Sequence, residues 1–181
     1  MLLIVSGLVT LTFSLAGCAD ISADVALLDE GTARATVSYT TDEATAASLA
    51  DAVGPGEEAP ICENIGSGVV TCVMTRTDTY ARLSEDGLKI DVQPDLQIKV
   101  SFDTSMLTGD LAAGPEQTDF MEMYRELFVR RRMSLSISGG AVTESNMLID
   151  GANQAKIDLS LEDVFSGDFD LPATYYAVIR L

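Results

Sequence analysis

Cysteine has the most reactive side chain in this chain of 181 residues, and it occurs as Cys18, Cys62 and Cys72. A cysteine thiol can be acylated, oxidised to a disulfide, or used as a nucleophile or metal ligand. Histidine is absent, which excludes Ser-His-Asp and Cys-His catalysis, an imidazole general base and histidine-ligated zinc or iron. Carboxylate-based hydrolysis and oxygen-ligated Ca²⁺ or Mg²⁺ sites stay open.

The residues before Cys18 point to acylation. Residues 1–17 carry no charge and end in Leu15, Ala16 and Gly17. This tetrapeptide resembles the lipobox of bacterial lipoproteins. The resemblance implies that residues 1–17 are a lipoprotein signal peptide, that Cys18 carries the acyl chains, and that the remaining chain lies outside the cytoplasm.

An ordinary secreted signal peptide and a retained membrane helix are the alternatives. A spanning helix needs about 20 apolar residues, and serine, threonine and glycine interrupt this run. No Lys or Arg precedes the run, where a signal peptide has a positive region, so a start upstream of Met1 stays open. We expect a bacterial cell-envelope protein. Its N-terminal acyl anchor would be its contact with the membrane, since two acyl chains are enough to hold a protein stably at a bilayer.

Cys62 and Cys72 form an even pair once Cys18 is acylated. In an oxidising compartment such a pair predicts a disulfide. The turn signal Gly66-Ser67-Gly68 lies between them and lets the chain bring the two β-carbons together. A redox or metal role is the alternative, although the CxxC spacing is missing.

The balance of charge limits the partners. The chain has 28 acidic and 11 basic side chains, a net charge of −17. Nucleic-acid binding requires Lys and Arg to neutralise phosphates, so we expect no nucleic-acid partner. A lipid ligand or a basic envelope protein fits better. No cofactor and no metal site are predicted. Residues 18–181 are long enough for one domain with its own core.

Hydrophobic periodicity predicts the elements that position these residues. Apolar and polar residues alternate over 20–39, 88–92, 96–102, 133–137 and 155–161, and strands are also expected over 69–83 and 171–181. Thr40 and Glu43 fit a capping box that begins a helix. A second helix is expected over 119–128. These elements predict an α+β fold, a largely antiparallel sheet of about eight strands with two helices packed on one face.

Two clusters are candidate binding sites. The arginines form a possible headgroup or anion site, unless they pair with the domain's own carboxylates. An apolar set on the second predicted helix is a possible ligand lining, unless it is ordinary core. The members of the two clusters are Arg125, Arg130, Arg131 and Arg132, and Phe120, Met123, Tyr124, Leu127 and Phe128.

The late part of the chain is similar to the LppM-type domain of bacterial envelope lipoproteins. The similarity lies in the strand 133–137, the glycines at 139–140, the segment VTESN at 142–146, the acidic glycine turn at 150–151 and the strand 156–161. It implies an anchored α+β domain that binds lipid or envelope components without catalysis, and it assigns no catalytic residues.

These observations favour a lipid-anchored envelope protein with a non-catalytic domain that binds an apolar or lipid ligand or an envelope component. The alternative is a structural accessory subunit of a larger envelope complex. A carboxylate-based hydrolase comes third.

Overall fold

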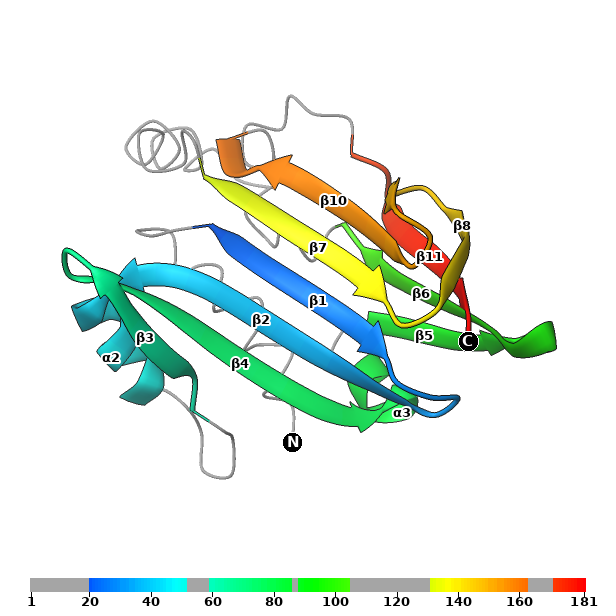
Figure 1. Ribbon diagram of the computed structural model, residues 1–181, viewed down its shortest axis with the longest axis horizontal. Coiled ribbons are helices and arrows are strands. Elements are labelled where there is room, and N and C mark those ends of the chain that lie inside the picture. Colours follow the sequence, from blue (N-terminus) through cyan, green and yellow to red (C-terminus); the bar gives the residue numbers. More distant parts are fainter. Residues whose placement is uncertain (1–19, 52–58, 86–87, 105–130, 163–170) are drawn as a thin grey trace, which may run out of the picture.

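The computed structural model describes residues 20–51, 59–85, 88–104, 131–162 and 171–181 (Figure 1). The strands are β1 (Ile21–Leu27), β2 (Thr32–Asp42), β3 (Ile61–Gly66), β4 (Val69–Thr79), β5 (Leu88–Gln93), β6 (Gln97–Asp103), β7 (Arg132–Ser138), β8 (Ala141–Ser145), β9 (Leu148–Asp150), β10 (Gln154–Ser160) and β11 (Thr174–Arg180). A seven-stranded sheet has the order β3-β4-β2-β1-β7-β10-β9, and a four-stranded sheet has the order β5-β6-β11-β8.

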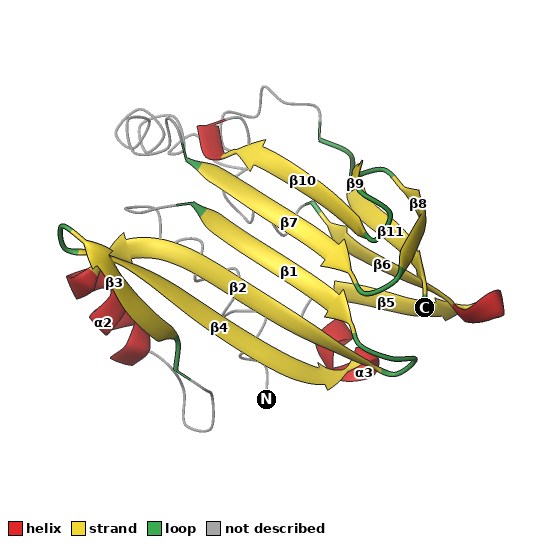
Figure 2. Ribbon diagram, viewed as in Figure 1, coloured by secondary structure: helices red, strands yellow, loops and turns green. Residues whose placement is uncertain are grey.

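The predicted α+β fold class is wrong. The described residues are mostly strand, eleven strands in two sheets, and their helices are short: α2 (Glu43–Asp51), α3 (Tyr80–Glu85) and the 3-10 turn η1 (Pro94–Leu96). Figure 2 shows α2 and α3 at separate ends of the long strands, so they do not form one helical layer on a sheet. The helix expected over 119–128 lies outside the described residues.

Three strands were missing from the sequence prediction, and each lacks the apolar alternation that reveals a half-buried strand. All six residues of β3 are exposed, and so are all three of β9. In β8 no residue is buried. The expected strand over 69–83 also ends earlier, because β4 stops at Thr79 and the chain turns into α3.

The alternation predicted over 20–39 forms the antiparallel hairpin of β1 and β2. Asp29 closes its turn by accepting hydrogen bonds from the backbone amides of Gly31 at 2.8 Å and Thr32 at 2.7 Å, and from the Thr32 hydroxyl at 2.8 Å. These donors stabilise the charged carboxylate and lower the pKa of Asp29, the Gly31 amide contributing most. The carboxylate therefore fixes the register in which Leu27 lies opposite Ala33.

A parallel pair, β1 with β7, lies in the middle of the seven-stranded sheet. Ile21 lies opposite Met133, and Ala26 opposite Ser138. The two strands therefore begin at the same end of the sheet, although Arg132 is 112 residues from Asp20. The predicted antiparallel hairpin connections did not include this pair, because no short-range pattern reports the pairing of distant strands.

Alternation along the strands gives the seven-stranded sheet two different faces. One face, here called the inner face, carries the buried residues of β1 and β7 such as Val25 and Ile137. The other, the outer face, is rich in hydroxyl groups, including Ser22 and Ser38, whose oxygens lie 2.6 Å apart. The inner face thus contributes to the core, and the outer face faces solvent.

The main core lies between the inner face and the four-stranded sheet. It joins Val25, Leu27 and Ile137 of the first sheet to Val100 and Ile179 of the second. The chain crosses between the sheets at Gly139 and Gly140. A β-carbon at Gly139 would lie 2.1 Å from the backbone oxygen of Leu27, and one at Gly140 would lie 2.3 Å from that of Arg180. Only glycine allows the backbone to approach so closely.

A smaller core lies at the other end of the seven-stranded sheet, beside α2. Its buried members are Tyr39, Ala46, Val70 and Cys72. The helix is capped by Asp42, whose carboxylate accepts the amides of Ala44 and Thr45, both at 3.0 Å. The predicted Thr40 capping box is therefore wrong, because β2 continues to Asp42 and the Thr40 hydroxyl lies 3.5 Å from that of Thr71 instead.

Candidate functional site

The structure brings Asp20, Arg131 and Arg132 together where β1 and β7 begin, and we call this the Asp20 end. The backbone N–H of Arg132 donates to a carboxylate oxygen of Asp20 at 3.0 Å. The backbone oxygen of Arg131 accepts from the N–H of Leu161 at 2.9 Å, which ties the same segment to the end of β10. Two of the predicted arginines thus lie beside Asp20, which is two residues after Cys18 in the sequence.

The two arginine side chains at this end are exposed. Arg131 and Arg132 are exposed, and among the described residues neither guanidinium group forms an ion pair. Pairing with the domain's own carboxylates, the alternative drawn from the sequence, is therefore not seen at these two positions. Cys18, Arg125 and Arg130 lie outside the described residues.

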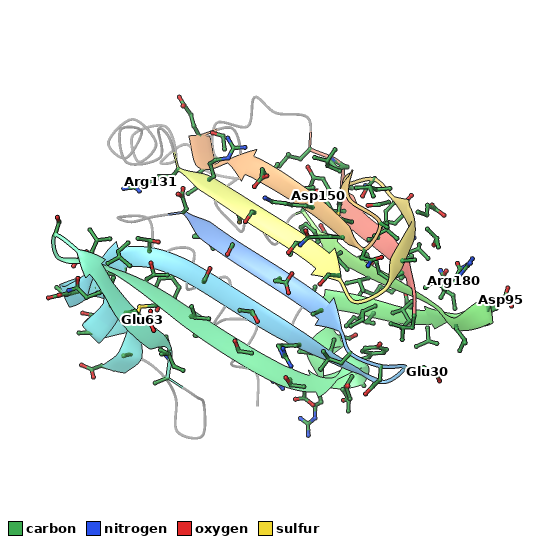
Figure 3. The ribbon with its side chains drawn as sticks, in the orientation of Figure 1. Glu30, Glu63, Asp95, Arg131, Asp150 and Arg180 are labelled. Atoms are coloured by element: carbon green, nitrogen blue, oxygen red, sulfur yellow. A yellow bond between two sulfur atoms is a disulfide. The ribbon has the colours of Figure 1, made fainter. Side chains whose placement is uncertain are left out.

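Charged side chains lie at both ends of the long sheet. Figure 3 shows Arg131 at one end of the long sheet and Glu30 and Asp95 at the other. Glu30 lies in the turn between β1 and β2, and Asp95 lies in η1. Arg180 also lies at that far end, and Glu63 lies at the same end as Arg131, so both ends of the sheet carry charges of both signs (Figure 3).

Tyr39 is buried at the Asp20 end with its hydroxyl group unpaired. It lies on β2 opposite Ile21 of β1 and opposite Cys72 of β4. Its side chain is 1% exposed, and its hydroxyl has no hydrogen-bond partner among the described residues. Burial raises the pKa of Tyr39, so the group stays a neutral phenol at physiological pH.

Thr41, two positions further along β2, is a second residue with a buried hydroxyl group. Its side chain is 2% exposed, and its hydroxyl is unpaired within the described part of the chain. Alternate residues of a strand share a face, so Thr41 and Tyr39 point to the same side of the sheet. An unsatisfied buried hydroxyl costs about 1–3 kcal/mol. Two of them side by side in an apolar cluster therefore need an explanation.

Neither hydroxyl was among the candidate site residues predicted from the sequence. The alternation over 20–39 ends at Tyr39, and the predicted capping box of Thr40 and Glu43 placed Thr41 at the start of a helix. In β2 the inward-facing positions are the odd-numbered residues from Ala33 onward, and Thr41 is one of them. This alternation could have predicted that the Thr41 side chain is buried. An inward-facing threonine at the end of an apolar alternation indicates a polar group within a core.

The predicted disulfide is present beside this cluster. The Cys62 and Cys72 sulfurs are bonded at 1.99 Å, and the two residues lie directly opposite each other on β3 and β4. Cys72 is fully buried against Tyr39 in the smaller core. The Asn64 side-chain amide donates to the Glu43 carboxylate at the start of α2. Together these links hold β3, β4 and α2 around the two unpaired hydroxyls.

The apolar ligand lining predicted on the second helix lies outside the described residues. Its members are Phe120, Met123, Tyr124, Leu127 and Phe128. Ile21 and Met74, partly buried, pack against the smaller core.

Within the described ranges no group of three or more His, Cys, Asp or Glu side chains is arranged to hold a metal ion. None of the helices described has the length and hydropathy of a membrane span.

The fold was compared with those of known proteins. Neither a protein-family model nor a curated protein matches the sequence. Among solved structures, the NMR structure of the folded domain of Mycobacterium tuberculosis LppM is similar, with a TM-score of 0.46, 11% sequence identity and 90% of each chain covered. This likeness concerns the path of the chain.

Proposed function

We propose that this protein is a lipid-anchored component of the bacterial cell envelope, and that its domain binds an apolar or lipid ligand at the Asp20 end without catalysing a reaction. In this proposal Cys18 carries the acyl anchor. Arg131 and Arg132 contact anionic headgroups near the membrane surface. The inner face of the sheet beside Tyr39 and Thr41 holds the ligand.

One observation carries the proposal: the hydroxyls of Tyr39 and Thr41 are buried side by side and have no hydrogen-bond partner among the described residues. Proteins rarely leave such groups without a partner, so a bound molecule that supplies the partner accounts for them. The surrounding residues Ala46, Val70 and Cys72 are apolar. A ligand that fits has a hydrocarbon part for these residues and a neutral polar group, such as an ester, amide or hydroxyl, for the two hydroxyls.

The location of this pair supports a lipid over a soluble metabolite. Tyr39 lies opposite Ile21, the first residue of β1 and three residues after Cys18. A ligand held there lies close to the point at which the chain would leave the membrane surface. Passage from the bilayer to the site would then be short, and the apolar part of the ligand would need little contact with water.

Native mass spectrometry of the full acylated chain, extracted from membranes in detergent, tests the proposal. We expect a hydrophobic molecule to copurify with the protein, and the double variant Tyr39→Phe/Thr41→Val to lose it. The matched control is Tyr176→Phe/Thr143→Val, because those hydroxyls have protein partners, Glu144 at 2.8 Å and the Val178 backbone oxygen at 3.2 Å. Absence of a ligand from repeated preparations, or equal occupancy in both double variants, would overturn the proposal.

Stability without ligand gives a second, independent result. Tyr39→Phe removes an unpaired buried hydroxyl and leaves the ring, so we expect the unliganded protein to become more stable by about 1 kcal/mol or more. Urea denaturation of delipidated protein measures this. A loss of stability would show that the protein itself satisfies the Tyr39 hydroxyl, and the site would then lose its main support.

A further inference from the structure

Among the described residues, strand β3 (Ile61–Gly66) is the edge of the seven-stranded sheet and pairs only with β4. At its last residue the Gly66 N–H donates to the Asn64 side-chain oxygen at 2.7 Å. No other described strand pairs with its outer side. An edge of this kind presents a row of N–H and C=O groups to which another extended chain can pair.

The side chains of β3 add an apolar surface to this free edge. Ile61 is 74% exposed and Ile65 is 62% exposed, and the exposed Glu63 lies between them. Ile61 also lies opposite Val73 of β4, so the apolar surface continues onto the next strand on the hydroxyl-rich outer face. A strand added beside β3 would place alternate side chains next to Ile61 and Glu63. Its following apolar position would lie near Ile65, which stands at the register shift between Asn64 and Gly66.

The edge is held rigid before any partner arrives. The disulfide Cys62–Cys72 joins β3 to β4, and the Asn64 side chain is bonded to Glu43 of α2. The backbone N–H of Glu43 donates in turn to the Gly68 oxygen at 3.3 Å, in the turn that connects β3 to β4. Strand addition here costs little ordering of the protein itself, which favours affinity.

The opposite edge of the same sheet is built differently. Strand β9 (Leu148–Asp150) has three residues, and a very short edge strand is a common protection against unwanted pairing. Strand β3 has six residues, with neither proline nor lysine among them. Of the two edges, only β3 is long enough to present several backbone groups in a row.

We infer that β3 is a docking edge for a partner protein that adds an extended strand of apolar, basic and apolar residues at alternate positions. The basic residue is required because Glu63 lies at the centre of the edge and the chain carries a net charge of −17. A second copy of this chain fits poorly, since antiparallel β3 pairing centred on Glu63 would bring two like charges opposite each other. This surface is separate from the Tyr39 and Thr41 site and does not depend on it.

Synthetic peptides added to the full chain in detergent micelles test this docking edge. The probe contains Val-Thr-Lys-Thr-Val, and its counterparts carry Glu in place of Lys or Pro in place of the threonine before Lys. We expect the Lys peptide to slow amide hydrogen exchange in residues 61–65 and to bind about threefold to tenfold more tightly than the Glu peptide. The Pro peptide should bind more weakly, because proline removes a ladder donor.

A charge reversal at the edge supplies the decisive comparison. Glu63→Lys should invert the preference so that the Glu peptide binds more tightly. Glu30→Lys changes the net charge equally in the turn between β1 and β2 and should keep the original preference. Failure of every peptide to protect residues 61–65, or an equal effect of the two substitutions, would overturn the inference. Dimerisation of the full chain through β3 in sedimentation analysis would also overturn it.

Discussion

The backbone N–H of Arg132 donates to the carboxylate of Asp20 across 3.0 Å, and so joins the start of β7 to the residue before β1. The parallel pairing of Ile21 with Met133 continues this contact into the sheet. Arg132 is thereby placed beside Asp20, which follows Cys18 by two residues in the sequence.

The arginines at the Asp20 end should increase binding to anionic membranes. In a Cys18→Ser chain, which has no acyl anchor, we expect Arg131→Ser/Arg132→Ser to weaken binding to vesicles containing anionic lipid. A basic residue near such a surface contributes about 1 kcal/mol, so the two together predict a loss of about 30-fold at low salt. Vesicle cosedimentation measures this change. The control Arg34→Ser/Arg180→Ser removes the same charge from exposed positions elsewhere, and an equal loss there would rule out a specific contact.

The disulfide should stabilise the domain measurably. Cys62→Ser leaves an exposed hydroxyl on β3 and a buried thiol at Cys72, so its main effect is removal of the crosslink. Closure of a loop of 10 residues contributes about 2.5–3 kcal/mol by the chain-entropy estimate. Urea denaturation should show a loss of this size, with faster amide exchange in β3. Thr77→Ser on β4 is the control, and a loss no larger than the control's would contradict the prediction.

Gly139 should not tolerate a side chain. Its φ is +117°, and a β-carbon would lie 2.1 Å from the backbone oxygen of Leu27, so the crossing between the sheets would have to open. We expect Gly139→Ala to destabilise the fold by about 3 kcal/mol or more. Gly151→Ala is the control, since Gly151 also has positive φ but open space around its β-carbon, and should cost about 1–2 kcal/mol. Thermal denaturation that ranked the two equally would refute the steric argument.

The turn at Asp29 should contribute to acid sensitivity. Hydrogen bonds, chiefly from the Gly31 amide, lower the pKa of Asp29 below its ordinary value of 3.8. A carboxyl whose pKa is lower in the folded state stabilises the fold above its unfolded pKa, and this contribution is lost as the pH falls through the folded pKa. We therefore expect Asp29→Asn to flatten the loss of stability below about pH 4.

Denaturation midpoints between about pH 2 and pH 6 measure this effect. Glu30→Gln, one residue along the same turn, removes an equal charge from a side chain for which the described residues show no hydrogen bond. It should leave the pH profile close to that of the unchanged protein. If both substitutions flattened the profile equally, general charge repulsion in the acidic chain would be the cause.

Strand β3 and the end of β2 at Thr41 could not be predicted from the local sequence pattern. Strand β3 is exposed throughout, so burial leaves no pattern in its residues, and only its pairing with β4 defines it. Thr41 alternates correctly with Ala33 and Tyr39, but the adjacent Asp42 and Glu43 also resemble a helix start. A local pattern could not decide where β2 ends, because the end depends on the length of β4 opposite it.

The sequence by itself determined the local features: the hairpin closed by Asp29, the crosslink available to Cys62 and Cys72, the acidic charge, and the absence of histidine chemistry. These depend on neighbouring residues or on composition, which the chain carries wherever it folds. The tertiary structure decided the division into two sheets, the parallel pairing of β1 with β7, the exposed edge at β3 and the meeting of Asp20 with Arg132. Such relationships join segments up to 112 residues apart, and they form only when burying the inner face against a second sheet selects one arrangement of strands.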